Sequence, residues 1–186
     1  MRPVSAFLLA ACLGACSVPG PREPDRFFIL EAAQAGGARA GGAVTVEPTS
    51  SASFYDTQDL AYSRAPGVRA YYQFNHWTER PARSVHAQLE SRLGGAGKAG
   101  PTLVTHLKEI YHDAAQEPGT ANITLSAELV DPATRAVLAR RTFSRSAPAA
   151  SYDAPGAVRG FNEALAALLG DLEGWVDAQA RRGPRP

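Results

Sequence analysis

Four side chains that could bind a metal ion lie between positions 106 and 113: His106, Glu109, His112 and Asp113. The residues around them predict a strand, on which His106 and His112 would share a face. At ~3.3 Å per residue the two imidazoles would be roughly 20 Å apart, which is too far for one ion. We therefore expect a solvated strand face here and no metal site.

Other catalytic motifs are incomplete or absent from the sequence. The segment Gly94-Gly95-Ala96-Gly97-Lys98-Ala99 resembles a phosphate-binding loop, but Ala99 replaces the Ser or Thr that holds Mg²⁺, and Arg92 replaces the first glycine. We expect it to connect a helix to a strand. The chain has no Gly-x-Ser-x-Gly elbow and no evident carboxylate pair, and His76 and His86 are isolated. The sequence therefore disfavours an enzyme.

The two cysteines, Cys12 and Cys16, both lie near the N-terminus. Their placement excludes internal disulfides, four-cysteine zinc sites, iron–sulfur clusters and a catalytic cysteine in the rest of the chain. Any chemistry of a thiol must therefore take place in the first sixteen residues.

Residues 1–15 predict a bacterial signal peptide. Arg2 precedes an apolar stretch at 6–15 that is shorter than the roughly 20 residues of a spanning helix. Leu13-Gly14-Ala15-Cys16 resembles the lipobox of bacterial lipoproteins, which implies diacylglycerol and an N-acyl lipid on Cys16 and no other cofactor. The alternative is an ordinary secretory signal with an incidental cysteine. Ser17 in place of an aspartate favours the outer membrane.

The remaining residues divide into a tether, one domain and a tail. Residues 16–25 comprise the lipidated Cys16 and a proline-rich stretch, 17–25, which predicts an extended tether of up to about 28 Å at ~3.1 Å per residue. Residues 26–180 form the predicted domain, and the basic segment 181–186 is expected to be disordered. Of the 19 basic residues Arg2 is lost with the leader, leaving 18 against 18 acidic ones. This balance gives no reason to expect nucleic acid as a ligand.

The hydrophobic pattern predicts a β-rich first half. Strands are expected at 26–30 and 43–47, a hairpin at 60–64 and 68–72, and a polar turn-like loop at 49–58. Thr78 is expected to cap a helix that has Glu79 in its first turn and Pro81 near its start. The apolar stripe of that helix comprises Ala82, Val85, Leu89 and Leu93.

The second half predicts three strands, at about 102–112, 121–130 and 136–146, and a long final helix over about 155–180. Eight large apolar residues recur in this helix at intervals of three or four: Val158, Phe161, Leu165, Leu168, Leu169, Leu172, Trp175 and Val176. Such a helix needs an apolar surface to cover, and a sheet provides one. We therefore predict a single α+β domain in which two amphipathic helices pack on one face of a mainly antiparallel sheet.

Four aromatic residues, Tyr71, Tyr72, Phe74 and Trp77, lie within seven positions just before the first helix. One interpretation is that they form the core and a strand-to-helix corner. The other is that one or more of them contacts a partner or a lipid tail, because aromatic residues are favoured at interfaces. The sequence alone does not choose between the two.

With these features together, the chain resembles the ABC-type transport auxiliary lipoproteins, the family of the lipoprotein in the paraquat-inducible membrane-integrity system. The resemblance covers about residues 26–180. It is carried by the lipobox, Phe27-Phe28-Ile29-Leu30, Val44-Thr45-Val46-Glu47-Pro48, Tyr62-Ser63-Arg64, Tyr71-Tyr72, Trp77-Thr78-Glu79-Arg80-Pro81 and Trp175-Val176. Phe28 stands where the family commonly has an aromatic hydroxyl.

The resemblance implies a non-enzymatic, periplasm-facing lipoprotein of the outer membrane. Its expected partners are a periplasmic mammalian-cell-entry (MCE) domain protein and an inner-membrane ABC permease and ATPase that move lipids. A homo-oligomeric collar, with the loop 49–58 and the run 71–77 as contact surfaces, is one form of that role. The alternatives are an envelope scaffolding lipoprotein of wall synthesis or secretion and, less favoured, a periplasmic hydrolase.

Overall fold

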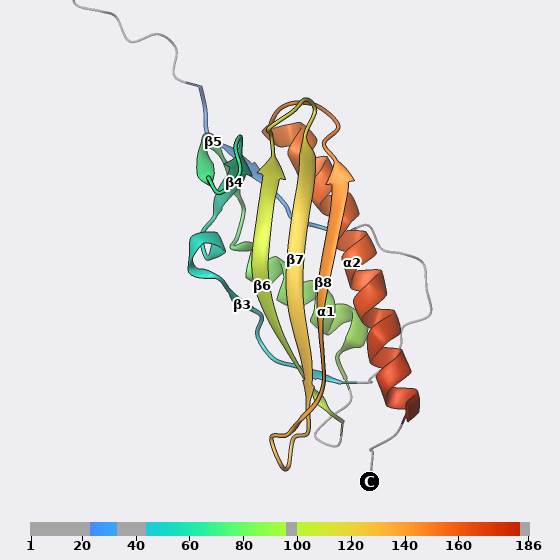
Figure 1. Ribbon diagram of the computed structural model, residues 1–186. Helices are drawn as coiled ribbons and strands as arrows, with labels where there is room; N and C mark the ends of the chain where they lie inside the picture. The colour runs from blue at the N-terminus through green and yellow to red at the C-terminus, as the bar shows by residue number, and fades with distance from the viewer. Residues whose placement is uncertain (1–22, 33–43, 96–99, 183–186) are drawn as a thin grey trace, which may run out of the picture.

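The computed structural model describes residues 23–32, 44–95 and 100–182. These residues form two α-helices and a mixed sheet of eight strands. Figure 1 shows the helices on one face of the sheet, which confirms the predicted α+β fold. The main strand order is β1-β5-β4-β6-β7-β8, and β2 and β3 both pair with β6. The strands are β1 (Arg26–Phe28), β2 (Thr45–Val46), β3 (Ser50–Ser51), β4 (Asp59–Ser63), β5 (Ala70–Trp77), β6 (Thr102–Asp113), β7 (Thr120–Val130) and β8 (Val137–Pro148).

The three long strands β6, β7 and β8 form the antiparallel centre of the fold. On β7, Ile123, Leu125, Ala127 and Leu129 are buried on the helix side, while the alternating residues are half-exposed on the other. This alternation is the one that the sequence predicts for a sheet with one covered face. The three predicted strands of this half are therefore confirmed.

The other half of the sheet is joined mostly by short parallel pairs: β1 with β5, and β2, β3 and β4 with β6. The sheet is thus mixed, with its long pairings antiparallel. The predicted hairpin is confirmed, since β4 pairs antiparallel with β5 across the turn at 64–69. Strand β5 continues to Trp77, so the aromatic run lies within a strand.

Helix α1 (Pro81–Leu93) follows β5 directly, and its predicted stripe is buried. The predicted cap is wrong. Arg80, not Thr78, is the N-cap residue, it makes no side-chain cap bond, and no acidic residue lies in the first turn. Pro81 explains the later start, because proline is well placed at the first helical position, where its missing N–H has no partner to lose. Gly94 ends the helix as predicted, and the connector to β6 includes residues 96–99, outside the described residues.

Helix α2 (Ala154–Arg182) packs mainly on β7 and β8 and covers the length of the sheet (Figure 1). All eight residues of its predicted stripe are buried. Trp175 meets Phe143 of β8 edge-on, with ring centroids 5.8 Å apart. The helix includes Arg181 and Arg182, so the tail predicted to be disordered from residue 181 starts inside a helix.

Two local departures change which side chains face the core. The pairing of β6 with β7 shifts by one residue between Leu107 and Glu109. This β-bulge reverses the alternation, so His106 is half-exposed and His112 is completely buried. The expectation that the two histidines share a solvated face is therefore wrong. The segment 49–58, predicted as a polar loop, contains β3 and the 3₁₀ helix η1 (Ser53–Tyr55), and Tyr55 is buried.

Candidate functional site

The predicted lipidation site Cys16, the signal peptide 1–15 and most of the tether lie outside the described residues. The first described residues, from Glu23, lead directly into β1, whose Arg26, Phe27 and Phe28 pair in parallel with Asn75, His76 and Trp77. Within the described ranges, no helix is both long and apolar enough to cross a membrane.

The aromatic run on β5 is divided between the core and the surface. Trp77 is 1% exposed and meets Phe161 of α2 edge-on at 5.5 Å, so its side chain belongs to the core. Tyr72 also points inward, Phe74 is half-buried, and Tyr71 is 39% exposed. For contact with a partner, Tyr71 is therefore the best-placed residue of the four.

Tyr71 stands in a surface cluster that joins the run to η1. Its ring stacks on Phe54 with centroids 4.5 Å apart, and its hydroxyl donates to the Phe54 carbonyl at 2.6 Å. Arg69 donates to the Tyr55 hydroxyl at 3.1 Å and lies 3.6 Å from the centroid of the Tyr111 ring. These contacts join parts of the two segments that the sequence proposes for partner contact, 49–58 and 71–77, in one surface patch made by η1 and Tyr71.

His112 is held in a buried hydrogen-bond chain that the sequence does not reveal. Its Nε2 lies 3.2 Å from the Pro118 carbonyl, and its Nδ1 lies 2.7 Å from the Tyr72 hydroxyl. Since the carbonyl can only accept, Nε2 carries the proton of the neutral ring and Nδ1 accepts from Tyr72. Burial lowers the pKa of His112 and raises the pKa of Tyr72 to about 12, so both groups stay uncharged at neutral pH.

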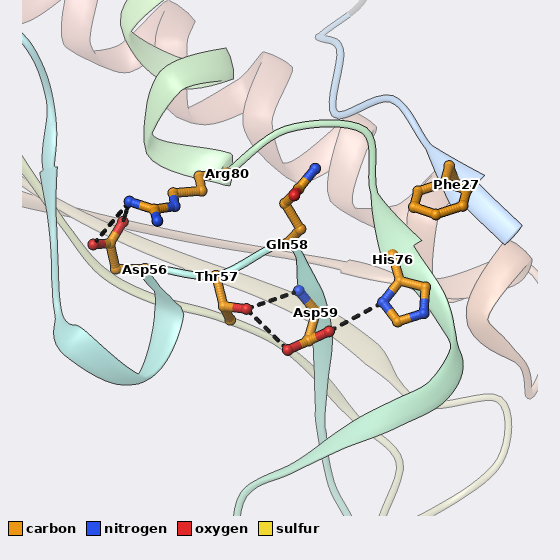
Figure 2. Close-up of a pocket in the computed structure, with 7 residues that line it drawn as sticks. All are labelled: Phe27, Asp56, Thr57, Gln58, Asp59, His76 and Arg80. Carbon is orange, nitrogen blue, oxygen red and sulfur yellow. Dashed lines mark hydrogen bonds and ion pairs between the residues drawn. The ribbon is translucent and has the colours of Figure 1, made fainter. Parts of the chain in front are cut away.

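A pocket of about 330 Å³ lies where β1, the loop 56–58, the start of β4, the end of β5 and the residue before α1 meet. Figure 2 shows its lining. It is lined by Phe27, Asp56, Thr57, Gln58, Asp59, His76 and Arg80. The sequence suggests that His76 is isolated, but in the structure its Nδ1 lies 3.0 Å from Asp59 and its Nε2 lies 3.8 Å from Asp25. The antiparallel pairing of β4 with β5 sets Asp59 opposite His76, and the parallel pairing of β1 with β5 sets Phe27 beside it.

The pocket contains no serine, cysteine or lysine nucleophile, and its two carboxylates already have partners. Asp59 accepts from Thr57 at 2.9 Å and contacts His76, while Arg80 contacts Asp56 at 3.5 Å. Across the described ranges, no group of three His, Cys, Asp or Glu side chains is arranged to hold a metal ion. What the described residues offer is a set of surfaces and a polar recess suited to binding.

The described residues thus form an α+β domain with a polar recess at one edge of its sheet. The chain belongs to the family described as the ABC-type transport auxiliary lipoprotein component, which it matches over residues 29–172. This confirms the resemblance drawn from the sequence. A comparison with curated proteins gave no match.

Solved structures share this fold. The crystal structure of protein XCC0632 from Xanthomonas campestris, of the DUF330 family, aligns with a TM-score of 0.72 at 19% identity, covering 84% of this chain and 98% of that one. A second crystal structure, of an uncharacterized protein, aligns with a TM-score of 0.57 at 14% identity, covering 86% and 97% of the two chains. At these identities the likeness concerns the fold.

Proposed function

We propose that this protein is a non-enzymatic subunit of an ABC-type system that moves lipids between two membranes. In this proposal Cys16 anchors it in the outer membrane and the domain faces the periplasm. The observation that carries the proposal is the family match over residues 29–172, which spans nearly the whole described domain. The lipobox at Cys16 and the lack of an evident catalytic group support it.

The specific role we propose is docking of a periplasmic MCE-domain protein, which works with an inner-membrane ABC permease and ATPase. The patch formed by η1 and Tyr71 is the surface offered for this contact, since Tyr71 and Ser53 are exposed there. An aromatic side chain that is partly exposed and held by neighbours contributes well to interfaces.

Passage of a whole lipid would require more than one copy of this domain. Exposing the acyl chains to water costs about 25 cal/mol per Å² of apolar surface, so a passing lipid must be shielded from water. The large apolar side chains of both helices are already packed against the sheet, and the pocket of about 330 Å³ is lined mostly by polar groups. A collar of several copies, or a conduit supplied by the partner, is therefore part of the proposal.

The anchor is tested by fractionating cells that express a Cys16→Ser variant. We expect it to leave the outer membrane for the soluble periplasmic fraction, whereas Cys12→Ser, the matched control, stays with the membrane. A Cys16→Ser protein that still floats with outer membranes and carries lipid would show that the anchor is elsewhere.

The partner is tested by photo-crosslinking in intact cells from Ser53 and Tyr71, with Glu163 on the exposed side of α2 as the control position. We expect the two patch positions to capture an MCE-domain protein or a second copy of this chain, and Glu163 to capture neither. Crosslinks from the patch that reach only wall-synthesis or secretion components would replace the transport role with envelope scaffolding.

A further inference from the structure

The pocket in Figure 2 has the charge pattern of a site for a zwitterion. Its lining holds two carboxylates, Asp56 and Asp59, and one guanidinium, Arg80, and the carboxylate of Asp25 lies 3.8 Å from His76. Figure 2 shows Arg80 beside Asp56 on one side of the recess and Asp59 beside His76 on the other. A ligand that brings both an ammonium and an anionic group satisfies the two sides at once.

Two exposed apolar residues, Phe27 and Ile29, lie within and just after β1. Phe27 is 62% exposed and Ile29 is 61% exposed, and they alternate along the chain with the inward residues Phe28 and Leu30. The Phe27 ring also lines the pocket, with its centroid 5.4 Å from that of His76. A polar recess with an apolar rim fits an amphiphile, whose headgroup and chain would contact the two parts.

The position of this rim in the chain limits its distance from the membrane. Phe27 follows Cys16 by eleven residues, and a fully extended chain spans at most ~3.6 Å per residue, so Phe27 cannot lie farther than about 40 Å from the anchor. A lipidated Cys16 would therefore hold this surface near enough for the tether to let it meet the bilayer.

We propose that the pocket and the pair Phe27 and Ile29 form a membrane-contact site that binds the phosphoethanolamine headgroup of a phospholipid in the anchoring bilayer. The ammonium lies between Asp56 and Asp59, the phosphate meets Arg80, and the two apolar side chains enter the acyl boundary. This inference rests on the lipid anchor of the proposed function. It goes beyond that function because the lipid orients the domain and is not its cargo.

The chemistry of the pocket selects among headgroups. An ethanolamine ammonium can donate hydrogen bonds to the carboxylates, whereas the trimethylammonium of choline cannot, and a glycerol headgroup carries no cation. Arg80 is 57% exposed in its side chain and contacts Asp56 at 3.5 Å, so it can turn to a phosphate without unfolding its surroundings.

The test uses the full-length lipidated protein reconstituted in vesicles that contain phospholipids with brominated chains. An Ile29→Trp variant reports contact through quenching of its tryptophan, and the buried Trp77 and Trp175 are accounted for by subtracting the wild-type signal. Leu138→Trp, at a similarly exposed site on the opposite edge strand β8, is the matched control.

We expect Ile29→Trp to be quenched and blue-shifted in vesicles with phosphatidylethanolamine, and Leu138→Trp to be unaffected. Adding Asp59→Asn should raise the fraction of phosphatidylethanolamine needed for half-maximal quenching by about tenfold, because a charge-assisted hydrogen bond is lost. Glu163→Gln, which removes a distant negative charge, should leave that fraction unchanged. Free phosphoethanolamine should compete with the lipid for the pocket. It should compete more weakly than the lipid does, because it has no acyl chains to contact the apolar rim.

Equal quenching of Ile29→Trp and Leu138→Trp would overturn the contact site. Equal quenching in phosphatidylcholine and phosphatidylethanolamine, or no effect of Asp59→Asn, would overturn the headgroup assignment. Competition by the free headgroup that equals that of the lipid would make the ligand a soluble phosphoethanolamine and overturn the membrane contact. A protein that does not float with the vesicles at all would instead refute the anchor of the proposed function.

Discussion

Within the described residues, Nδ1 of the buried His112 accepts a hydrogen bond from the hydroxyl of Tyr72, 2.7 Å away. Tyr72→Phe removes that oxygen and keeps the ring, which packs 4.8 Å from Tyr62 and 6.3 Å from His112. The variant therefore tests one hydrogen bond with little change in packing. Leaving a buried acceptor without a donor costs about 1–3 kcal/mol.

This cost should be visible in the stability of the domain. For a protein of this size, ~1 kcal/mol corresponds to a shift in melting temperature of about 2–4 °C, so Tyr72→Phe should lower it by about 2–12 °C. Denaturant unfolding followed by circular dichroism gives the free energy directly, with an unchanged m value expected.

Tyr152→Phe is the matched control for this prediction. The Tyr152 hydroxyl also donates to a buried turn, at 2.7 Å from the Ala114 carbonyl, but its side chain is 41% exposed. Water can replace this bond, so the control should cost less than about 1 kcal/mol. A Tyr72→Phe variant as stable as the wild type, or no less stable than Tyr152→Phe, would refute the assignment of Nδ1 as a dependent acceptor.

Three further changes test other parts of the fold. Burial lowers the pKa of His112 below its ordinary 6.5, so the unfolded chain takes up a proton before the folded chain does as the pH falls. The free energy of unfolding should therefore be full above about pH 6.5 and decline below it. Unfolding midpoints measured across this range should show a smaller decline for His112→Gln. Leu165→Ala on the buried stripe should cost about 2–5 kcal/mol in thermal unfolding, whereas the exposed Glu163→Ala should cost little; no loss for Leu165→Ala would place that stripe against solvent. Gly170→Ala should stabilise α2 by about 0.4–1 kcal/mol, since the added Cβ would meet open space. Gly119→Ala should destabilise the domain, because φ is +84° there and the added Cβ would collide with the His112 ring. The opposite order of melting temperatures would contradict both expectations.

The candidate site was only partly readable from the chain. The sequence singles out the aromatic run 71–77, but it cannot tell that Trp77 faces the core while Tyr71 faces solvent. The register of β4 against β5 shifts between Asp59 and Ala61. Such a shift changes which side chains face the core, and no local sequence pattern predicts where it occurs. The pocket around His76 depends on a three-residue parallel strand, β1, which is far from β5 in the sequence.

What the sequence determined by itself is what local periodicity and composition encode. The stripe of α2, the alternation on β7 and the hairpin of β4 and β5 follow from side-chain spacing, because a buried face imposes a period of 3.6 or 2 on apolar residues. Short motifs in a fixed order also indicate the family, and the family match over residues 29–172 confirms it. Only the tertiary structure decided the burial of His112 and the meeting of Phe27, Asp59, His76 and Arg80. These depend on one inserted residue in β6 and on pairing between distant strands, whose energies come from contacts that exist only after the chain has folded.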